Sequence, residues 1–502
     1  MTDYRKYRLL EMVPGLMVWA TFAIALGLSV FRPIWAIYFI IVFDLYWLVR
    51  ISYMMGYVYL GYSRFRKESS VDWLEKCEQL TDWRTVYHLI FIPTYKEPYE
   101  VLRDTFNGLT RSSFPLDRFI VVLAGEEKDA NDFLRIANTL RSEFGKVFFD
   151  FLITVHPQNA PGDLPGKGSN IAWAGNEAKK LIDTLGVHYD KVIVSSFDAD
   201  TVVHSQYFSY LTYRYFTHPN PTHASFQPVP LFNNNVWETH AFSRVVSYST
   251  TFWLMSEQLR PERMYTFSSH SMSFQALVDV GFWQRDIVTE DSRIGLQGLM
   301  HYDGDYRIEP LYIPLSMDIV SGRTFWQTVK SQYKQQRRWA YGVENFPWMI
   351  WNFGINARMP FVVKFRYVFN QLEGVYSWAT APIVIFIVGR LPLWIAQQQK
   401  TVDAIAQNAP NILSWLMSAA MLGIFLSAIL GATLLPPKPP QASKWRYLIM
   451  IFQWALLPVT LIFFGSIPAT DAVTRLMLGK YLGFDVTRKL RKRIKHSATT
   501  VE

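Results

Sequence analysis

The sequence predicts an α/β domain with a parallel-rich sheet, inserted between transmembrane α-helices. Apolar segments of near-bilayer length gather at the two ends of the 502-residue chain. Between them, short β-branched runs alternate with helical stretches. Half of the residues are hydrophobic, and aromatic residues are abundant (18 Trp, 27 Tyr, 36 Phe). This distribution is typical of a multi-pass membrane protein with one large polar insert.

The first two apolar runs, residues 13–30 and 33–48, predict a transmembrane hairpin within residues 1–60. A second run follows the first so closely that we do not expect a removable signal peptide. Basic residues flank the hairpin on both sides, and the positive-inside rule then places both flanks in the cytosol. These residues are Arg5, Lys6 and Arg8 before the hairpin, and Arg64, Arg66 and Lys67 after it.

Three more apolar runs, residues 376–395, 412–435 and 447–467, predict C-terminal transmembrane helices over residues 371–470. Three crossings would place the C-terminus outside, whereas the basic stretch 475–495 favours the cytosol. Either a fourth crossing is hidden, or one stretch is re-entrant or lies in the interface. Pro468 ends the last run, so we expect the exception within residues 456–478.

The polar insert, residues 61–325, shows the pattern of a parallel α/β sheet. In such sheets ligands bind at the carboxyl ends of the strands. Two polar segments follow predicted strands at such ends, namely Pro93 to Glu97 and Asp198 to Asp200. The expected strands are 86–92, 118–123, 147–155 and 191–197, and the expected helices are 131–144 and 171–185.

The net charge of +9 does not predict a nucleic-acid partner, because the basic residues cluster in short runs beside apolar segments. That placement favours the anionic surface of a membrane, with lipids as partners. Cys77 is the one cysteine in the sequence, which excludes an internal disulfide and a cysteine-built zinc site.

Asp198 and Asp200 follow an apolar strand and are one residue apart. Two carboxylates on such a turn can share Mg²⁺ or Mn²⁺ with substrate phosphates, which makes both residues candidate metal ligands. The alternative is an ordinary solvated turn, since turns are rich in Asp. The apolar strand before the pair favours the metal site.

Glu290 and Asp291 follow Thr289 at the start of a predicted short helix. Either the carboxylates cap this helix, or one of them removes the proton from an attacking hydroxyl group.

The segment Gln335-Gln336-Arg337-Arg338-Trp339 lies in residues 326–370, which we predict to form amphipathic helices at the membrane interface. Arginine suits a pyrophosphate, and tryptophan offers a flat apolar face to a sugar ring. The alternative is a surface helix beside the membrane.

Gly166-Lys167-Gly168-Ser169-Asn170 leads into a predicted helix. The glycines permit close approach of the backbone, Lys167 can meet a phosphate, and a helix N-terminus favours anions. The spacing is not that of a P-loop, and an ordinary loop before a helix is the alternative.

With these motifs in this order, the chain resembles the family 2 glycosyltransferases, specifically the processive membrane branch that contains cellulose and hyaluronan synthases. The resemblance extends from about His88 to Trp339 and includes the layout of the flanking helices. It implies a GT-A-type domain and a metal-dependent inverting transfer from a nucleotide sugar, with a UDP-sugar as the favoured donor. The implied product is a β-linked polysaccharide made at the cytosolic membrane face, with or without translocation. The alternative is a transferase that adds one sugar to a lipid acceptor.

The resemblance also implies roles for individual residues. The nucleoside pocket is assigned to Thr94, Tyr95 and Glu97. The donor diphosphate is assigned to Lys167, Asp198 and Arg338, and the general base to Asp291, with Glu290 beside it. Acceptor contacts are assigned to Gln335 and Trp339.

The tail, residues 471–502, carries Phe484-Asp485-Val486-Thr487-Arg488-Lys489, which resembles the Phe-x-Val-Thr-x-Lys gating loop of the cellulose synthase branch. This resemblance implies that Thr487 and Lys489 touch the nucleotide and that the C-terminus is cytosolic. Both termini are then cytosolic, and the compact single-chain layout favours a bacterial inner membrane. A homo-oligomer or an export subunit would fit a polysaccharide product.

Two segments depart from the family pattern. The family places an Asp pair after the second strand to hold the nucleotide base, whereas this chain has Glu126 and Glu127. Either one of them substitutes, or the base is held differently. The second departure is Ser268-Ser269-His270-Ser271, in which His270 either faces the acceptor or is a structural histidine.

Overall fold

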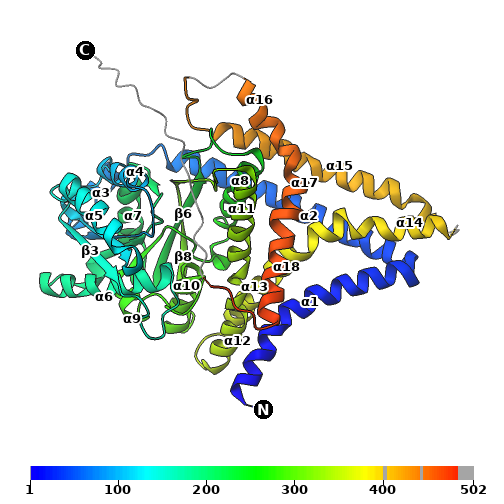
Figure 1. Cartoon of the computed structure of the whole chain (residues 1–502), viewed down its shortest axis with the longest axis horizontal. Coiled ribbons are helices and arrows are strands. Elements are labelled where there is room, and N and C mark those ends of the chain that lie inside the picture. The colour runs from blue at the N-terminus through cyan, green and yellow to red at the C-terminus, as the bar shows by residue number, and fades with distance from the viewer. Residues whose placement is uncertain (1, 400–403, 441–444, 484–502) are drawn as a thin grey trace.

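The computed structural model describes residues 2–399, 404–440 and 445–483. Figure 1 shows an α/β domain on one side of the molecule and long helices that project from it on the other. The N-terminal helices are α1 (Asp3–Phe31) and α2 (Pro33–Glu68). Pro33 stands at the first turn of α2, where its fixed φ suits a helix start. Helix α2 ends at Glu68, so it extends beyond residue 60, the predicted limit of the N-terminal hairpin. Its contacts reach the α/β domain.

The first half of the sheet is parallel, as predicted. Strands β1, β2, β3 and β4 and helices α5 and α6 all coincide with predicted elements to within a few residues. The order β3-β2-β1-β4 runs in parallel throughout. Their bounds are β1 Tyr87–Pro93, β2 Phe119–Glu126, β3 Asp150–His156, β4 Val192–Ser196, α5 Ala130–Phe144 and α6 Lys167–Leu185.

The second half of the sheet is mixed, and the full order is β3-β2-β1-β4-β7-β6-β8-β5. Strand β7 pairs antiparallel with both β4 and β6, whereas β6 and β8 pair in parallel. Together the two halves form the GT-A-like α/β fold that the resemblance implies. The strands are β5 Val202–Val203, β6 Ala224–Phe232, β7 His270–Ser273 and β8 Arg307–Met317.

Helices cover both faces of the sheet, which explains why its central strands are apolar on both faces. Along β1, Ile90 and Ile92 belong to one buried cluster, and Leu89 and Phe91 to the other. Burial of one such side chain contributes about 1.5–3 kcal/mol. One face packs against α3 (Trp73–Glu78), α4 (Tyr99–Thr110), α5 and α7 (Tyr207–Thr217). The other packs against α6, α9 (Phe274–Asp279), α10 (Glu290–His301) and α12 (Asn345–Ile355).

Helix α8 of the insert and helix α11, which follows the insert, pack against the N- and C-terminal helices. Helix α8 (Ala241–Glu257) packs between β6 and α2, and α11 (Phe325–Ala340) packs against the last helix, α18. The C-terminal helices are α13 Phe361–Phe386, α14 Leu391–Gln398, α15 Ala404–Thr433, α16 Trp445–Phe452, α17 Leu457–Thr460 and α18 Ile467–Met477, with a π-helical turn at Leu461–Ser466.

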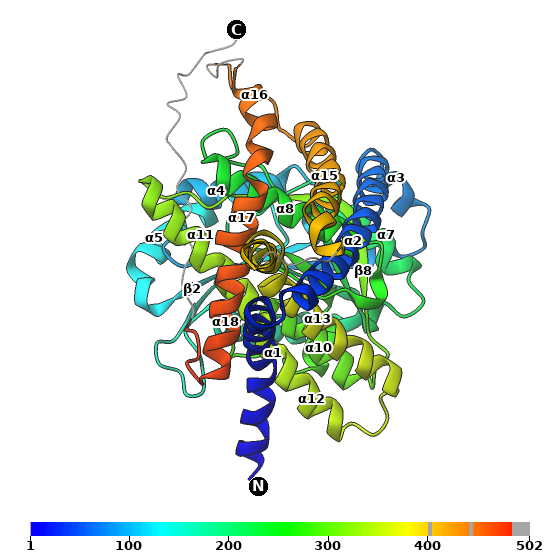
Figure 2. The same ribbon diagram turned by 90° about the vertical axis from the view of Figure 1, so that its right-hand side faces the viewer.

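Five stretches are long and apolar enough to cross a membrane, with two before the insert and three after it, as predicted. They are Asp3–Phe31, Pro33–Glu68, Phe361–Gln398, Gln407–Thr433 and Trp445–Met477. The last stretch differs from the others in direction. In Figures 1 and 2, α1, α2, α14 and α15 project away from the sheet, whereas α16, α17 and α18 run in line across the face from which they project.

Polar contacts join this last stretch to the α/β domain along its whole length. Arg446 Nη1 donates to the Trp237 carbonyl at 2.9 Å near its start. Further along, Gln453 Oε1 accepts from Arg244 at 2.7 Å. Near its end, Arg337 donates to Asp471 at 3.0 Å. A helix that crosses a bilayer away from a domain would contact that domain at one end only.

Candidate active site

The carboxyl ends of β1, β2 and β4 meet at one edge of the sheet. The register pairs Phe91 with Ser196 and Pro93 with Ala124, so the segments that follow these strands are neighbours. Asp198 follows β4 by two residues, and the N-terminus of α6 starts at Lys167 near the same edge. The topology therefore brings together the predicted nucleoside, metal and lysine motifs.

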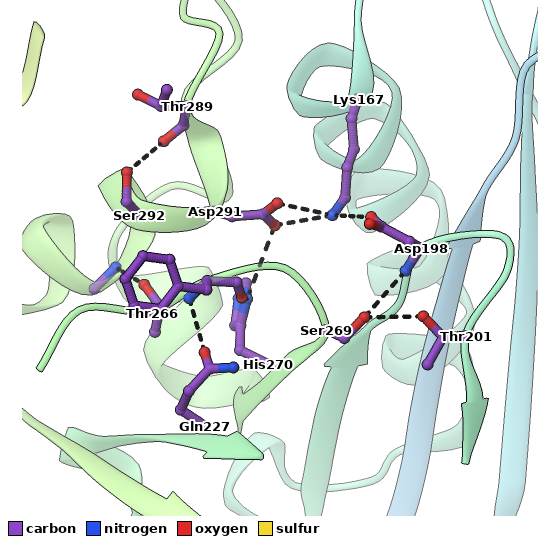
Figure 3. Close-up of polar contacts among 12 residues, drawn as sticks. Lys167, Asp198, Thr201, Gln227, Thr266, Ser269, His270, Thr289, Asp291 and Ser292 are labelled. Carbon is purple, nitrogen blue, oxygen red and sulfur yellow. Dashed lines mark hydrogen bonds and ion pairs between the residues drawn. The ribbon is translucent and has the colours of Figure 1, made fainter. Parts of the chain in front are cut away.

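Lys167 lies between two carboxylates from distant parts of the sequence (Figure 3). Its Nζ donates to Asp198 Oδ1 at 2.8 Å and to both oxygens of Asp291 at 2.9 Å. The lysine side chain is only 10% exposed, so its ammonium group depends on these partners for compensation of its charge. Three motifs predicted separately from the sequence thus meet at one ammonium group.

The adjacent carboxyl groups of Glu290 and Asp291 lie in different environments. Burial, and then the charge of Asp291, raise the pKa of Glu290 to about 8. Glu290 is therefore largely protonated at neutral pH, whereas both oxygens of Asp291 accept from the lysine. Burial alone would lower the pKa of Lys167, but Asp198, Asp291 and Glu290 raise it above its ordinary value. Two neighbouring carboxyl groups in such different environments suit different roles.

The glycine after Lys167 is needed for packing. A Cβ on Gly168 would lie 2.9 Å from the Gln284 carbonyl oxygen and 3.0 Å from Glu290 Cβ. The glycine therefore allows the backbone of α6 to lie close to the loop at Gln284 and to Glu290, the first residue of α10. Helix α6 also starts at Lys167, four residues before the predicted start at residue 171.

Ser269 holds the turn that carries Asp198. The backbone N–H of Asp198 donates to Ser269 Oγ at 3.3 Å, and Thr201 Oγ1 is 3.0 Å from the same oxygen. Ser269 has a φ of +66°, a left-handed conformation that costs a non-glycine residue about 1–2 kcal/mol. The sequence marked this segment only as a departure from the family pattern, and the role of Ser269 depends on the β4–β7 pairing, which the sequence did not predict.

Asp200 is buried and tied to the end of β8. Its Oδ2 accepts from the backbone N–H of Asp318 at 2.7 Å, and its carbonyl accepts from Asn234 Nδ2 at 3.0 Å. Within the described ranges, no three His, Cys, Asp or Glu residues are grouped so that they could hold a metal ion. Mg²⁺ normally takes one or two carboxylates together with substrate phosphates and water. Asp198 and Asp200 are therefore compatible with an ion that a diphosphate would help to hold.

The residues of the Gln335 to Trp339 motif on α11 point in different directions. The charge of Arg338 opposes the rise in the pKa of Glu290, so Arg338 lies in the neighbourhood of the site. Arg337 instead pairs with Asp471 of α18 at 3.0 Å. Gln335 is buried and accepts from Gln332 at 3.2 Å. Trp339 is half-buried, with its ring 6.3 Å from that of Phe232.

His270 lies beneath Asp291 and is 1% exposed. Its Nδ1 donates to the Phe267 carbonyl at 2.9 Å and is 3.9 Å from Asp291 Oδ1. Burial lowers the pKa of His270, so the ring is neutral and its Nε2 is an acceptor. That Nε2 is buried and has no hydrogen-bond partner in the described part of the chain. This position favours the structural alternative over direct contact with an acceptor.

The predicted nucleoside segment follows β1 directly. Thr94 is buried, and its backbone N–H donates to the Ala124 carbonyl at 2.8 Å. Lys96 turns the chain with a φ of +60°, between the half-buried residues Tyr95 and Glu97. Asn170 of α6 donates to the same Ala124 carbonyl at 3.2 Å, and its own buried Oδ1 lacks a partner within the described ranges. The sequence analysis did not single out Asn170 as a site residue.

Glu126, the last residue of β2, contacts the end of β3, and Glu127 contacts the loop between β3 and α6. Glu126 Oε2 is 3.0 Å from His156 Nδ1, and Glu127 Oε2 accepts from the Gln158 backbone at 2.6 Å. Their substitution for the base-binding Asp pair stays a prediction.

Thr487 and Lys489, with the rest of the gating-like motif, lie outside the described residues.

His156 joins two carboxylates in a buried cluster. Its ring is 3% exposed and lies 3.0 Å from Glu126 on one side and 3.0 Å from Asp163 on the other. Arg285 also contacts Asp163, at 3.4 Å. Burial alone would lower the pKa of His156, but hydrogen bonds to the two carboxylates raise it above its ordinary value. A protonated ring donates to both partners.

Comparisons with known proteins give one matching family and several similar solved structures. The model of a family described as glycosyl transferase family group 2 matches residues 193–470. A mannosyltransferase from Pyrobaculum calidifontis, solved with GDP-Man and Mn²⁺, is 14% identical with a TM-score of 0.42, covering 77% of this chain and 99% of its own. TarS 1–349 from S. aureus, solved with UDP-GlcNAc, is 14% identical with a TM-score of 0.37, covering 80% and 94%. No curated protein matches the chain.

The His156 cluster predicts a pH-dependent stability. Because the pKa of His156 is higher in the folded than in the unfolded chain, its contribution is complete below about pH 6.5. The contribution is lost as the pH rises through the folded-state pKa. We expect the thermal unfolding midpoint of detergent-purified protein to fall more steeply above about pH 6.5 in wild type than in His156→Gln. His188→Gln, at an exposed histidine, should follow wild type. Parallel curves for wild type and His156→Gln would contradict the assignment.

Proposed function

The chain belongs to the glycosyl transferase family group 2, and we propose that it transfers a sugar from a nucleotide sugar, with inversion, at the cytosolic face of a membrane. The observation that carries this proposal is the contact of Lys167 with Asp198 and Asp291. Through this contact, a lysine that can bind phosphate meets an aspartate that can bind a metal ion and a second aspartate that is the candidate general base. A UDP-sugar is the proposed donor, and a glycan or a lipid is the proposed acceptor.

Asp291 is the proposed general base. It would take the proton of an acceptor hydroxyl as that oxygen attacks the anomeric carbon and the bond to the diphosphate breaks. Glu290 is less suited to this role because burial and Asp291 raise its pKa to about 8, so that it already holds a proton at neutral pH. The burial of Glu290 and the contacts of Asp291 with Lys167 therefore support Asp291 as the base.

Lys167 and Arg338 are the proposed partners of the leaving diphosphate. A diphosphate would compete for the Lys167 ammonium, and its arrival would release Asp291 from the contact that now holds it. Mg²⁺ or Mn²⁺, if held by Asp198 and Asp200, would supply further positive charge against the same leaving group. Gln335 and Trp339 on α11 would orient the acceptor beside the donor, which contributes through positioning.

We propose a β-linked polysaccharide as the product, on the basis of the resemblance to the processive branch. One observation favours the alternative, a single sugar on a lipid acceptor. The projecting helices meet in an apolar core, in which Val18, Ile37, Ile40 and Val384 are at most 2% exposed. A growing chain would have to separate these side chains to pass between the helices.

Nucleotide release by the detergent-purified protein tests the proposal. The protein would be incubated with a panel of UDP- and GDP-sugars, with Mg²⁺ or Mn²⁺ and with a chelator as control, and the product sized. We expect release with one UDP-sugar and loss of release with the chelator. A long polymer supports the synthase, whereas a glycolipid with one sugar supports the alternative. No release with any donor in the presence of metal and membrane lipid would contradict the proposed activity.

Substitution of the two adjacent carboxyl groups distinguishes their roles. Asp291→Asn should abolish transfer, by about 10²–10⁴-fold, but spare nucleotide binding, because only the proton acceptor is lost. Glu290→Gln should retain more activity, because glutamine resembles the protonated form that Glu290 already adopts. Transfer rates and nucleotide affinity would be measured on both variants. Transfer by Asp291→Asn at near the wild-type rate would exclude Asp291 as the base.

We further propose that the stretch Trp445–Met477 lies in the membrane interface and does not cross. Its direction and its contacts with Trp237, Arg244 and Arg337 support this arrangement. Four of the five apolar stretches then cross the membrane, which returns the chain to its starting side. Both termini and the catalytic domain would be cytosolic, as the basic flanks favour.

Cysteine labelling tests this topology. Cys77 is buried and can be replaced by serine, after which single cysteines are introduced at two exposed positions. Lys480→Cys follows α18, and Arg32→Cys lies in the turn between α1 and α2. In intact cells we expect a membrane-impermeant maleimide to label Arg32→Cys but not Lys480→Cys, and to label both after permeabilisation. External labelling of Lys480→Cys would show that the last stretch crosses.

A further inference from the structure

A second polar pocket lies apart from the active site, where the start of α8 meets α16. Its volume is about 250 Å³, several times the roughly 30 Å³ that one water molecule occupies in the liquid. Two arginines and one glutamate give its lining a net charge of +1. The lining residues are Trp237, Glu238, Thr239, Arg244, Arg446, Ile449 and Met450.

Arg244 is 6% exposed, and the hydrogen bonds it makes within the described ranges are all to neutral groups. Its Nε donates to Gln453 Oε1 at 2.7 Å, and its Nη1 donates to the Thr239 carbonyl at 2.6 Å. A longer contact of 3.4 Å joins Nη1 to the Val236 carbonyl. Buried charges are normally paired with an opposite charge, because the loss of water must be compensated. Arg244 is held in position but its charge is not balanced by a carboxylate of the described chain.

The surroundings of Arg244 add positive potential. Arg244 lies in the first turn of the 17-residue helix α8, where the helix dipole is positive and favours anions over cations. Arg446 approaches from α16, and burial followed by the charge of Arg446 lowers the pKa of Arg244 to about 10. An anion between the two guanidinium groups would compensate the buried charge of Arg244 and reduce its repulsion from Arg446.

Two further donors of the pocket could serve such an anion. Arg446 is exposed, and the one hydrogen bond it makes in the described part of the chain is to the Trp237 carbonyl, at 2.9 Å. Trp237 is 8% exposed, and its Nε1 is buried without a hydrogen-bond partner among the described residues. Two arginine forks and an indole N–H are the kind of donors that bind phosphate oxygens.

The rim of the pocket is apolar and exposed. On α16, Trp445 and Phe452 are each 72% exposed, and Ile449, which lines the pocket, is 52% exposed. Exposed apolar side chains at this density mark a surface that meets lipid or a partner. A ligand that places an anion between the arginines and an apolar chain along α16 would match both parts of the surface.

We propose that this pocket binds a phosphate group, and that its source is the headgroup of an anionic membrane lipid whose acyl chains lie along α16. The lipid would fix α16 against α8 and so hold the last apolar stretch on the catalytic domain. This site shares no residue with the proposed active site. Its test reads binding and not sugar transfer, so a failure of either proposal leaves the other intact.

Thermal unfolding of the full-length, delipidated protein in detergent provides the test. Short-chain phosphatidylglycerol should raise the unfolding midpoint by about 2–5 °C at saturation. Short-chain diacylglycerol, which has the same chains without phosphate, and inorganic phosphate without chains should each raise it by less. A shift of equal size with inorganic phosphate would overturn the lipid assignment, and an equal shift with diacylglycerol would overturn the anion site.

Arg446→Gln locates the effect. The side chain is exposed, so the variant should fold, and it should lose most of the phosphatidylglycerol shift. Arg358→Gln is the matched control, because Arg358 is an 85% exposed arginine that pairs with Asp303 away from the pocket. It should keep the full shift. An unchanged shift in Arg446→Gln, or an equal loss in both variants, would overturn the proposal.

Discussion

The site depends on one buried ammonium group, that of Lys167, held between Asp198 and Asp291. These carboxylates come from the end of a parallel strand and from the start of a helix about ninety residues later, so the lysine fixes the two parts of the site relative to each other. A buried charge of this kind stabilises only when its partners are present, because loss of one partner leaves an uncompensated charge. Burial, and then the charge of Asp291, raise the pKa of Glu290, whereas the charge of Lys167 lowers it. A diphosphate that displaces Asp291 from Lys167 would therefore change the electrostatics of the whole site.

The active-site loop is joined to the projecting helices by packing. Val288, directly before Thr289, belongs to the same buried cluster as Tyr341 after α11 and Val473 of α18. The ion pair between Arg337 and Asp471 adds a polar connection between α11 and α18. Close-packed protein interiors transmit displacements. Movement of the last apolar stretch would therefore shift the loop that contains Val288. The motif proposed to bind the acceptor thus lies on a helix that also contacts the last apolar stretch.

The direction of the last apolar stretch reconciles its hydropathy with the charge of the tail. Hydropathy shows only that a segment is apolar enough to enter a bilayer. This holds both for a helix that crosses the bilayer and for one that lies in its interface. The distinguishing features are Asp471 and Gln453, which would be costly in a bilayer centre but find Arg337 and Arg244 on the catalytic domain.

The α/β class, the four parallel strands and the five apolar stretches can be predicted from the residue order, because they follow from periodicity, β-branched runs and segment length. The sequence also identified Lys167, Asp198 and Asp291, since each follows a strand or begins a helix in a recognisable motif. The tertiary structure alone decided that these three side chains meet, that Ser269 holds the Asp198 turn, and that His270 is buried. Strand β7 is four residues of which three are polar, and its burial depends on pairing with β4 and β6, which no local pattern predicts. The different environments of Glu290 and Asp291 likewise depend on burial and on the position of Lys167, which are properties of the packed chain and not of the residue order.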